Sequence, residues 1–220
     1  MSAEFMIHAC PARMWYVDEF LIPSMIAQGI PERSIEVWND DSGKGNLASC
    51  MDAFADCGRR RGGTWHLQDD VIISRDFAEK TAKLDNGIVC GFVNETFGPN
   101  VSMHGDNIPV AFMYNSFQCI RIPNALAGEC ADWVRTEAPK DSHCQGMIAS
   151  GKCDDSLWVE FLAARHPDIR VTNLRPCIVD HIDFLLGGSV INRWRGYHAR
   201  AYWWDDEDRV DELKEKLAHR

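Results

Sequence analysis

The chain has 220 residues and is 45% hydrophobic, which suffices for one large domain with its own core. Its formal net charge is −10, from 23 basic and 33 acidic side chains, and this balance argues against a protein that coats nucleic-acid phosphates. The nine cysteines are dispersed without a CxxC pair, which argues against a secreted disulfide scaffold and against a structural zinc site.

Strand and helix patterns alternate along the first half of the chain. Apolar runs predict strands at 5–10, 34–40 and 64–74, and a helical stripe at 16–30 is interrupted by Pro23. Apolar residues at helical spacing predict an amphipathic helix that starts at Asn46, as its N-cap, and ends near Gly58.

The second half continues the alternation with less regularity. Predicted helices cover 75–84, 124–138 and 154–166, and predicted strands cover 87–94 and 111–123. Residues 168–182 are expected to form a late strand and a loop, and residues 95–115 are loop-rich. We therefore expect an α/β fold, with a mixed, mostly parallel sheet sandwiched by helices in a single domain. The domain is expected over residues 1–204, with a charged helix over 205–220. Neither a signal peptide nor a membrane span is expected.

Polar residues fall where the predicted strands end. Cys10-Pro11, Asn39-Asp40 and Asp69-Asp70 each follow an apolar run. In open α/β sheets, ligands bind beyond the carboxyl ends of the strands. The sequence therefore predicts a site at this edge of the sheet.

Asp69 and Asp70 lie side by side within the apolar stretch "GGTWHLQDDVIIS". They could form a solvated turn, or they could bind a divalent cation, because burying unpaired carboxylates is costly. Carboxylates with few protein ligands suit Mg²⁺ or Mn²⁺. We expect such an ion, rather than a protein cation, to neutralise the pair.

The glycine loop "DSGKGN" lacks the spacing of a phosphate-binding Walker motif. It is either a solvated turn before a helix, or a nucleotide contact in which Asp40 accepts a hydrogen bond from a base or ribose. Asp154 and Asp155 open the helix over 154–166. They either offset its unsatisfied amides or supply a general base for an incoming hydroxyl.

Two further features have open interpretations. His181 lies between apolar residues and acids, and it would be structural unless it reaches a metal at Asp69 and Asp70. Arg193 and Arg195, with Arg200, form a basic island that is either surface charge or a diphosphate contact.

Taken in order, these motifs resemble those of GT-A-type nucleotide-sugar glycosyltransferases, nearest to small bacterial or bacteriophage members. The resemblance covers roughly residues 5–195, from the "HACPAR" loop to the histidine after "RP". It implies a Rossmann-like GT-A fold. "LQDDV" resembles the family's DxD metal motif but departs from strict Asp-x-Asp.

The resemblance also implies roles for individual residues. Asp70 and His181 would be metal ligands, with Asp69 as a further ligand or a ribose contact. Asp155 would be the catalytic base, with Asp154 as second choice. The implied donor-binding residues are His8, Ala9, Pro11, Arg13, Asp40, Lys44, Asn46, Gln68, Asp69, Arg193 and Arg195.

The implied activity is the transfer of a sugar from a nucleotide diphosphate-sugar, such as a UDP-sugar, to an acceptor hydroxyl. The reaction would use Mn²⁺ or Mg²⁺ and would invert the anomeric centre if Asp155 acts as base. The acceptor could be a glycan, a small molecule or a protein, and the net charge disfavours DNA. The expected location is cytoplasmic, in the host cytoplasm if a bacteriophage encodes the chain. The alternatives are a nucleotidyltransferase, or a non-catalytic nucleotide-binding module of the same fold.

Overall fold

Successive side chains of the first strand, β1 (Phe5–Ala9), face two different hydrophobic cores. Phe5, Ile7 and Ala9 belong to the first core, and Met6 belongs to the second. This is the two-residue period of a strand buried on both faces. The computed structural model describes residues 4–83, 87–95, 98–99, 107–109, 117–151, 154–187 and 200–219.

In the described part of the chain, seven strands form one mixed sheet in the order β2-β1-β3-β7-β5-β8-β6. The further strands are β2 (Ile35–Asn39), β3 (Gly63–Gln68), β5 (Ile88–Cys90), β6 (Asn107–Pro109), β7 (Cys119–Pro123) and β8 (Arg170–Asn173). β2 and β3 flank β1 in parallel, β7 and β6 run antiparallel to their neighbours, and β5 and β8 pair in parallel. Most of these strands therefore run in one direction, and the predicted α/β class with a mixed, mostly parallel sheet is confirmed.

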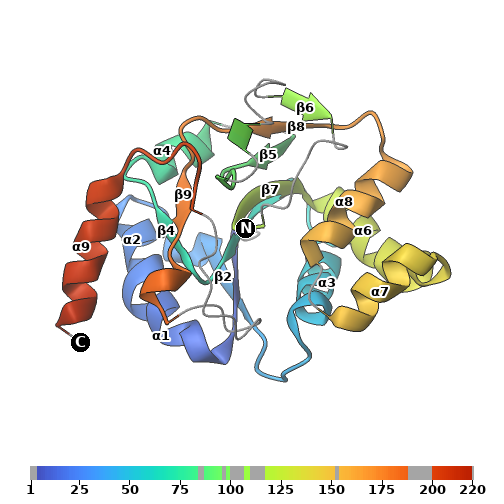
Figure 1. The fold of residues 1–220 in the computed structure, drawn as a ribbon, viewed down its shortest axis with the longest axis horizontal. Helices are drawn as coiled ribbons and strands as arrows, with labels where there is room; N and C mark the ends of the chain where they lie inside the picture. Colours follow the sequence, from blue (N-terminus) through green and yellow to red (C-terminus); the bar gives the residue numbers. More distant parts are fainter. Residues whose placement is uncertain are drawn as a thin grey trace.

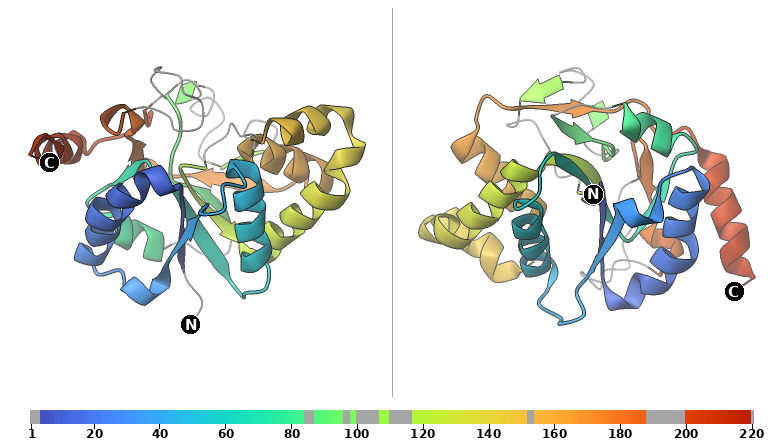
Figure 2. Two further views of the ribbon diagram at one scale, coloured as in Figure 1. Left: turned by 90° about the horizontal axis from the view of Figure 1, so that it is seen from below. Right: turned by 180° about the vertical axis from the view of Figure 1, so that it is seen from behind.

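Two groups of helices cover the two faces of the sheet (Figures 1 and 2). The first core is covered by α1 (Met14–Tyr16), the π-helical segment Val17–Leu21, α2 (Ile22–Ala27), α4 (Phe77–Ala82) and α9 (Glu207–Ala218). The second core is covered by α3 (Asn46–Cys57), α6 (Asn124–Thr136), α7 (Ser142–Ser150) and α8 (Asp154–Arg165). None of the helices in these described ranges is long and apolar enough to cross a membrane.

The predicted single strand over 64–74 is wrong, because the structure has two strands there. β3 ends at Gln68, and β4 (Val71–Ile73) pairs antiparallel with β9 (Val179–His181) in a separate two-stranded sheet. Asp69 and Asp70 form the turn between the two sheets. No glycine or proline marks this turn, so the apolar residues on either side read as one run. The register places Val71 opposite His181, which brings the histidine beside Asp70.

Two helical predictions also need correction. Residues 16–27 of the predicted stripe belong to a continuous helical stretch from Met14 to Ala27. Pro23 directly follows its π-helical segment, where the N–H of Ile22 already bonds the carbonyl of Val17 in place of the regular i−4 partner. The helix α7 was not predicted, because Cys144 is its one buried residue and it therefore lacks an apolar stripe. Its N-cap is Asp141, whose Oδ1 accepts hydrogen bonds from the amides of His143 and Cys144 at 2.8 and 3.0 Å.

Helix α6 passes close to the end of α3 at two glycines, Gly128 within α6 and Gly58 directly after α3. A Cβ atom added to Gly128 would lie 2.8 Å from the Cα atom of Gly58, and one added to Gly58 would lie 2.6 Å from the Cα atom of Gly128. Because both contacts are with backbone, no side chain can move aside to relieve them.

We expect Gly128→Ala to lower the free energy of unfolding by about 1–3 kcal/mol, because the added methyl group forces α6 away from α3. The matched control is Gly146→Ala in α7, where an added Cβ atom has nothing within 4 Å. Alanine there should be neutral or stabilising by up to about 1 kcal/mol. Urea unfolding of the two variants measures the difference, and equal stabilities would contradict this account of the helix contact.

Candidate functional site

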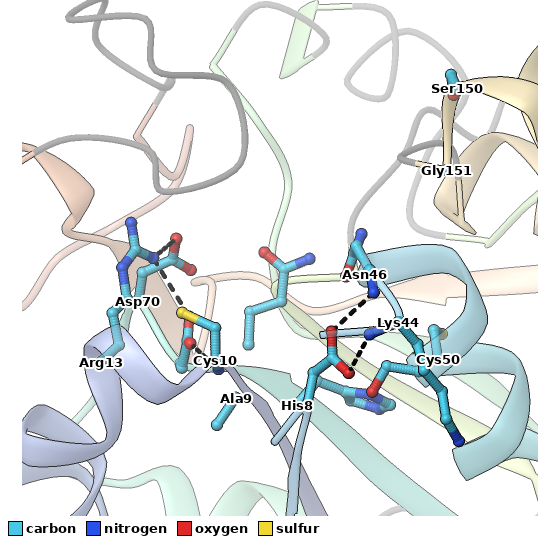
Figure 3. A pocket seen from close by; sticks show the side chains of 15 residues that line it. His8, Ala9, Cys10, Arg13, Lys44, Asn46, Cys50, Asp70, Ser150 and Gly151 are labelled. Carbon is cyan, nitrogen blue, oxygen red and sulfur yellow. Dashed lines mark hydrogen bonds and ion pairs between the residues drawn. The ribbon is translucent and has the colours of Figure 1, made fainter. Parts of the chain in front are cut away.

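A pocket of about 440 Å³ lies at the carboxyl ends of β1, β2 and β3. It is lined by His8, Ala9, Cys10, Arg13, Asp40, Lys44, Gly45, Asn46, Ser49, Cys50, Gln68, Asp69, Asp70, Ser150 and Gly151. In Figure 3, Arg13, Cys10 and Asp70 lie on one side of it, and Lys44, Asn46 and Cys50 lie on the other. Most residues expected to bind a donor nucleotide are therefore brought to one pocket.

The carboxylate pair is neutralised by a protein cation, so the expectation that it lacks one is wrong. Nη1 of Arg13 bonds Oδ1 of Asp69 at 3.2 Å and also bonds Oδ2 of Asp70. All three side chains are buried, since Arg13, Asp69 and Asp70 expose 4%, 8% and 7% of their surface. The remaining oxygen of Asp69, Oδ2, accepts the backbone N–H of Cys10 at 2.8 Å. Sequence spacing could not reveal this pairing, because the partners are 56 and 57 residues apart.

The two carboxylates differ in their electrostatic environment. Burial and the charge of Asp70 raise the pKa of Asp69 to about 6, although Arg13 and the amide of Cys10 oppose the shift. Burial alone would also raise the pKa of Asp70, but His181 and Arg13 outweigh it and lower that pKa. Asp70 is therefore the carboxylate that stays ionised.

His181 reaches the carboxylate pair from β9, as its place opposite Val71 requires. Its Nε2 lies 3.0 Å from Oδ2 of Asp70. Burial alone would lower the pKa of His181, but Asp70 and then the fully buried Asp183 raise it. Asp183 is one of the acids that flank His181 in the sequence, but no role was predicted for it.

The backbone beside His181 is fixed by Asp180, which is fully buried. Oδ2 of Asp180 accepts Nε–H of Arg200 at 2.7 Å. Oδ1 accepts the backbone N–H of Ala201 at 2.7 Å and that of His181 at 2.9 Å. Arg200 was expected near Arg193 and Arg195, but those two lie outside the described residues. The contacts of Arg200 therefore hold the C-terminal segment against β9.

The atoms at Asp70 and His181 are of types that a divalent metal accepts as ligands. Oδ1 of Asp70 is buried and has no hydrogen-bond partner among the described residues. Carboxylate oxygens and a histidine nitrogen are ligands that Mn²⁺ accepts, and Mg²⁺ prefers the oxygens. However, no group of three or more His, Cys, Asp or Glu side chains in the described ranges is arranged to hold a metal ion. At Asp70, the guanidinium of Arg13 occupies part of the space around the carboxylate.

The glycine loop after β2 is organised by Asp40. Its Oδ1 accepts the backbone N–H of Lys44 at 2.9 Å, and its Oδ2 accepts that of Gly45 at 2.8 Å. Gly45 has a φ of +92°, which an L side chain rarely adopts. Nζ of Lys44 is exposed and lies 2.9 Å from Oδ2 of Asp52. Asp40 thus shapes the pocket wall through the loop, in addition to lining the pocket.

Asn46 links this loop to the acidic start of α8. It was expected to be the N-cap of α3, but Gly45 holds that position and Asn46 is the first helical residue. Its Nδ2 donates to Oδ1 of Asp154 at 2.7 Å, and the next amide, of Leu47, donates to the carbonyl of Gly151 at 3.0 Å. The loop after β2 is therefore hydrogen-bonded to the start of α8 and to the residue that follows α7.

Asp154 and Asp155 have different surroundings. Asp154 lies at a small cavity shared with His8, Asn46 and Gln68. Burial and the charge of Asp155 raise its pKa to about 7, although the hydrogen bond from Asn46 lowers it. Asp155 is less deeply buried, and its Oδ1 accepts the N–H of Ser156 at 2.7 Å. Burial raises its pKa also. Asp154, whose pKa is about 7, can thus exchange a proton near neutral pH.

The half-buried His8, which lines the pocket, pairs with the buried His66 behind it. Nε2 of His8 lies 2.9 Å from Nδ1 of His66, and the rings stack with centroids 5.2 Å apart. Burial lowers the pKa of His8 to about 4, and burial and His8 lower that of His66 further. Both rings are therefore neutral at neutral pH and share one hydrogen bond. His66 was not predicted, although its place on the strand next to His8 could have suggested it.

Pro11 does not line the pocket, unlike the other expected donor-binding residues in the described part of the chain. It begins the short 3-10 helix Pro11–Arg13, in which the N–H of Arg13 donates to the carbonyl of Cys10 at 3.0 Å. Proline suits this first position because its φ is already helical. Its contribution is to direct Arg13 towards the carboxylates.

Removal of His181 should change how stability depends on pH. Because the folded-state pKa of His181 is raised, its stabilising contribution is fully present below about pH 6.5 and is lost as pH rises through the raised value. We expect the stability difference between wild type and His181→Gln to shrink as the pH rises above about 6.5 and through the raised pKa of His181. The exposed His219→Gln is the control. Urea unfolding at several pH values measures this, and a difference independent of pH would contradict it.

Removal of the Asn46 side chain should raise the pKa of Asp154 above about 7, because the lost hydrogen bond favours the ionised carboxylate. Carboxyl ¹³C NMR titration of Asn46→Ala measures the shift directly. The control is Asn39→Ala, which removes an amide that bonds Asp41 instead and should leave Asp154 unchanged. An unaltered titration of Asp154 in Asn46→Ala would show that this hydrogen bond does not control the carboxylate.

Comparisons with known proteins do not place the chain in a family. No protein-family model matches the sequence, and no curated protein is similar to it. The resemblance to GT-A glycosyltransferases therefore remains a hypothesis from motifs. A function for the chain has to be derived from the residues of the pocket.

Proposed function

We propose that the chain is a metal-dependent glycosyltransferase, which moves a sugar from a nucleotide diphosphate-sugar to an acceptor hydroxyl. One observation carries the proposal: the Asp69–Asp70 pair, Arg13 and the Asp40 loop line a single pocket at the carboxyl ends of β1, β2 and β3. Nucleotides bind at this place in open α/β sheets. The pocket also adjoins the acidic start of α8, through the cavity at Asp154.

The donor would lie across the strand ends. On one side, the loop held by Asp40 offers Lys44 to the nucleotide. On the other side, Arg13 lines the pocket and would face the diphosphate, because a guanidinium pairs well with phosphate oxygens. Asp70 and His181, with Asp69 nearby, would hold a divalent metal. When bound, such an ion stabilises the charge that develops on the leaving diphosphate.

The acceptor would approach from the side of α8. Asp155 would take the proton of the acceptor hydroxyl as its oxygen attacks the anomeric carbon, and attack opposite the leaving diphosphate inverts that centre. Asp154 is the second candidate for the base. Its hydrogen bond to Asn46 keeps the start of α8 against the donor loop. The two halves of the reaction would therefore share one hydrogen-bonded framework.

Thermal unfolding with UDP, GDP and CDP, each with and without Mn²⁺, tests donor binding. One nucleotide at about 100 times its Kd should raise Tm by about 5–10 °C. The increase should need Mn²⁺ and should disappear in Asp70→Ala. The control is Asp132→Ala, an exposed position of α6 that does not line the pocket. The absence of any nucleotide response would refute the proposal.

Catalysis is tested separately with the sugar-nucleotide that binds. Asp155→Ala should keep nucleotide binding but lose transfer about 10²–10⁴-fold, since a general base is removed. If Asp155→Ala transfers sugar as fast as wild type, Asp154 is the general base. In that case Asp154→Asn should lose transfer. Nucleotide binding without transfer or sugar-nucleotide hydrolysis would indicate a binding module instead.

A further inference from the structure

Arg13 occupies part of the place that a metal ion would need at Asp70. Its Nη1 bonds Oδ2 of Asp70, the same oxygen that lies 3.0 Å from Nε2 of His181. Arg13, Asp70 and His181 are all buried, so water screens these charges little. A divalent ion at Asp70 would therefore lie next to a guanidinium.

A protein cation already balances part of the local negative charge. Asp69 and Asp70 both contact the guanidinium of Arg13, and Nε2 of His181 lies 3.0 Å from Oδ2 of Asp70. Two further positive charges at Asp70 would repel Arg13 strongly, because like charges interact more strongly away from water. Metal binding at Asp70 thus requires the guanidinium to leave that carboxylate.

The side chain of Arg13 can leave while its backbone stays in place. The 3-10 helix Pro11–Arg13 is anchored to Asp69 through the amide of Cys10, at 2.8 Å, and this bond does not involve the guanidinium. Arg13 also lines the pocket, where a diphosphate offers it two or more oxygens. A phosphate group is therefore a second partner within the same pocket.

We propose that Arg13 is an internal cation that competes with the divalent metal for Asp70 and moves to the donor diphosphate when the metal binds. The inference rests on the proposed function. It makes metal and nucleoside diphosphate bind cooperatively: each removes part of the cost of displacing Arg13 from Asp70. By thermodynamic reciprocity, each ligand raises the affinity of the other by the same factor.

Mn²⁺ binding to the full-length protein, followed by the electron paramagnetic resonance of free Mn²⁺, tests the competition without any activity assay. Arg13→Met removes the competitor, so it should bind Mn²⁺ alone about tenfold more tightly than wild type. Arg61→Met, at an exposed position outside the pocket, should behave as wild type. Asp70→Asn in the Arg13→Met background should abolish the gain. Equal Mn²⁺ affinity in wild type and Arg13→Met would overturn the proposal.

Arg13→Lys is a second variant that tests the proposal if Arg13→Met folds poorly. It keeps the charge but cannot bridge two carboxylates with one planar group, so its Mn²⁺ affinity should lie between those of wild type and Arg13→Met. Wild-type affinity for Mn²⁺ should rise about tenfold with saturating UDP, GDP or CDP, and that rise should be lost in Arg13→Met. A rise of the same size in both proteins would overturn the exchange. If wild type still transfers sugar while Arg13→Met shows no change in Mn²⁺ binding, the inference fails and the proposed function stands.

Discussion

The guanidinium of Arg13 between Asp69 and Asp70 joins parts of the chain that the fold would otherwise leave separate. Arg13 follows β1, the two acids form the turn between the main sheet and the two-stranded sheet, and His181 arrives on β9. Two adjacent carboxylates cannot be buried without positive partners, so this turn is stable only if the loop after β1 and the strand β9 are both in place. The long-range order of this half of the molecule thus depends on charge pairing as well as on apolar packing.

A second contact gives the pocket its other wall. Asn46 bonds Asp154, and Leu47 bonds the carbonyl of Gly151, so the loop after β2 is fastened to the connection between α7 and α8. Asp154 and Asp155, at the start of α8, differ from Asp70. Burial raises the pKa of both, and the charge of Asp155 raises that of Asp154 further, whereas His181 and Arg13 lower the pKa of Asp70. The pocket and the small cavity beside it therefore combine Asp70, which stays charged, with Asp154, whose pKa of about 7 allows proton exchange near neutral pH. Such a division is typical of sites where one acid binds a cation and another moves a proton.

The sequence predicted more of the fold than of the site. Apolar periodicity placed β1, β2, α3, α6 and α8 correctly, because each has a side buried against a core. It read the residues over 64–74 as one strand, because the turn at Asp69 and Asp70 carries no glycine or proline. It did not find the α7 helix, whose stability depends on the cap at Asp141 more than on burial. The strand ends indicated where the pocket would be, but the pairing of Arg13 with both acids depends on three-dimensional proximity that no local pattern encodes.

The hydrogen-bonded pair of His8 and His66 has a consequence for any ligand that contacts His8 in the pocket. Two neutral imidazoles joined by one hydrogen bond cannot choose their tautomers independently, because one ring must donate and the other accept. A ligand that donates to Nδ1 of His8 would require His8 to donate to His66, so that His66 carries its proton on Nε2. A ligand that accepts from Nδ1 of His8 would require His66 to donate, so that Nε2 of His66 has no proton. Nε2 of His66 is buried without a hydrogen-bond partner in the described part of the chain, so the two states differ in what they leave unsatisfied beside Phe54. The polarity of a single hydrogen bond to the ligand is thereby transmitted through the sheet into the second core.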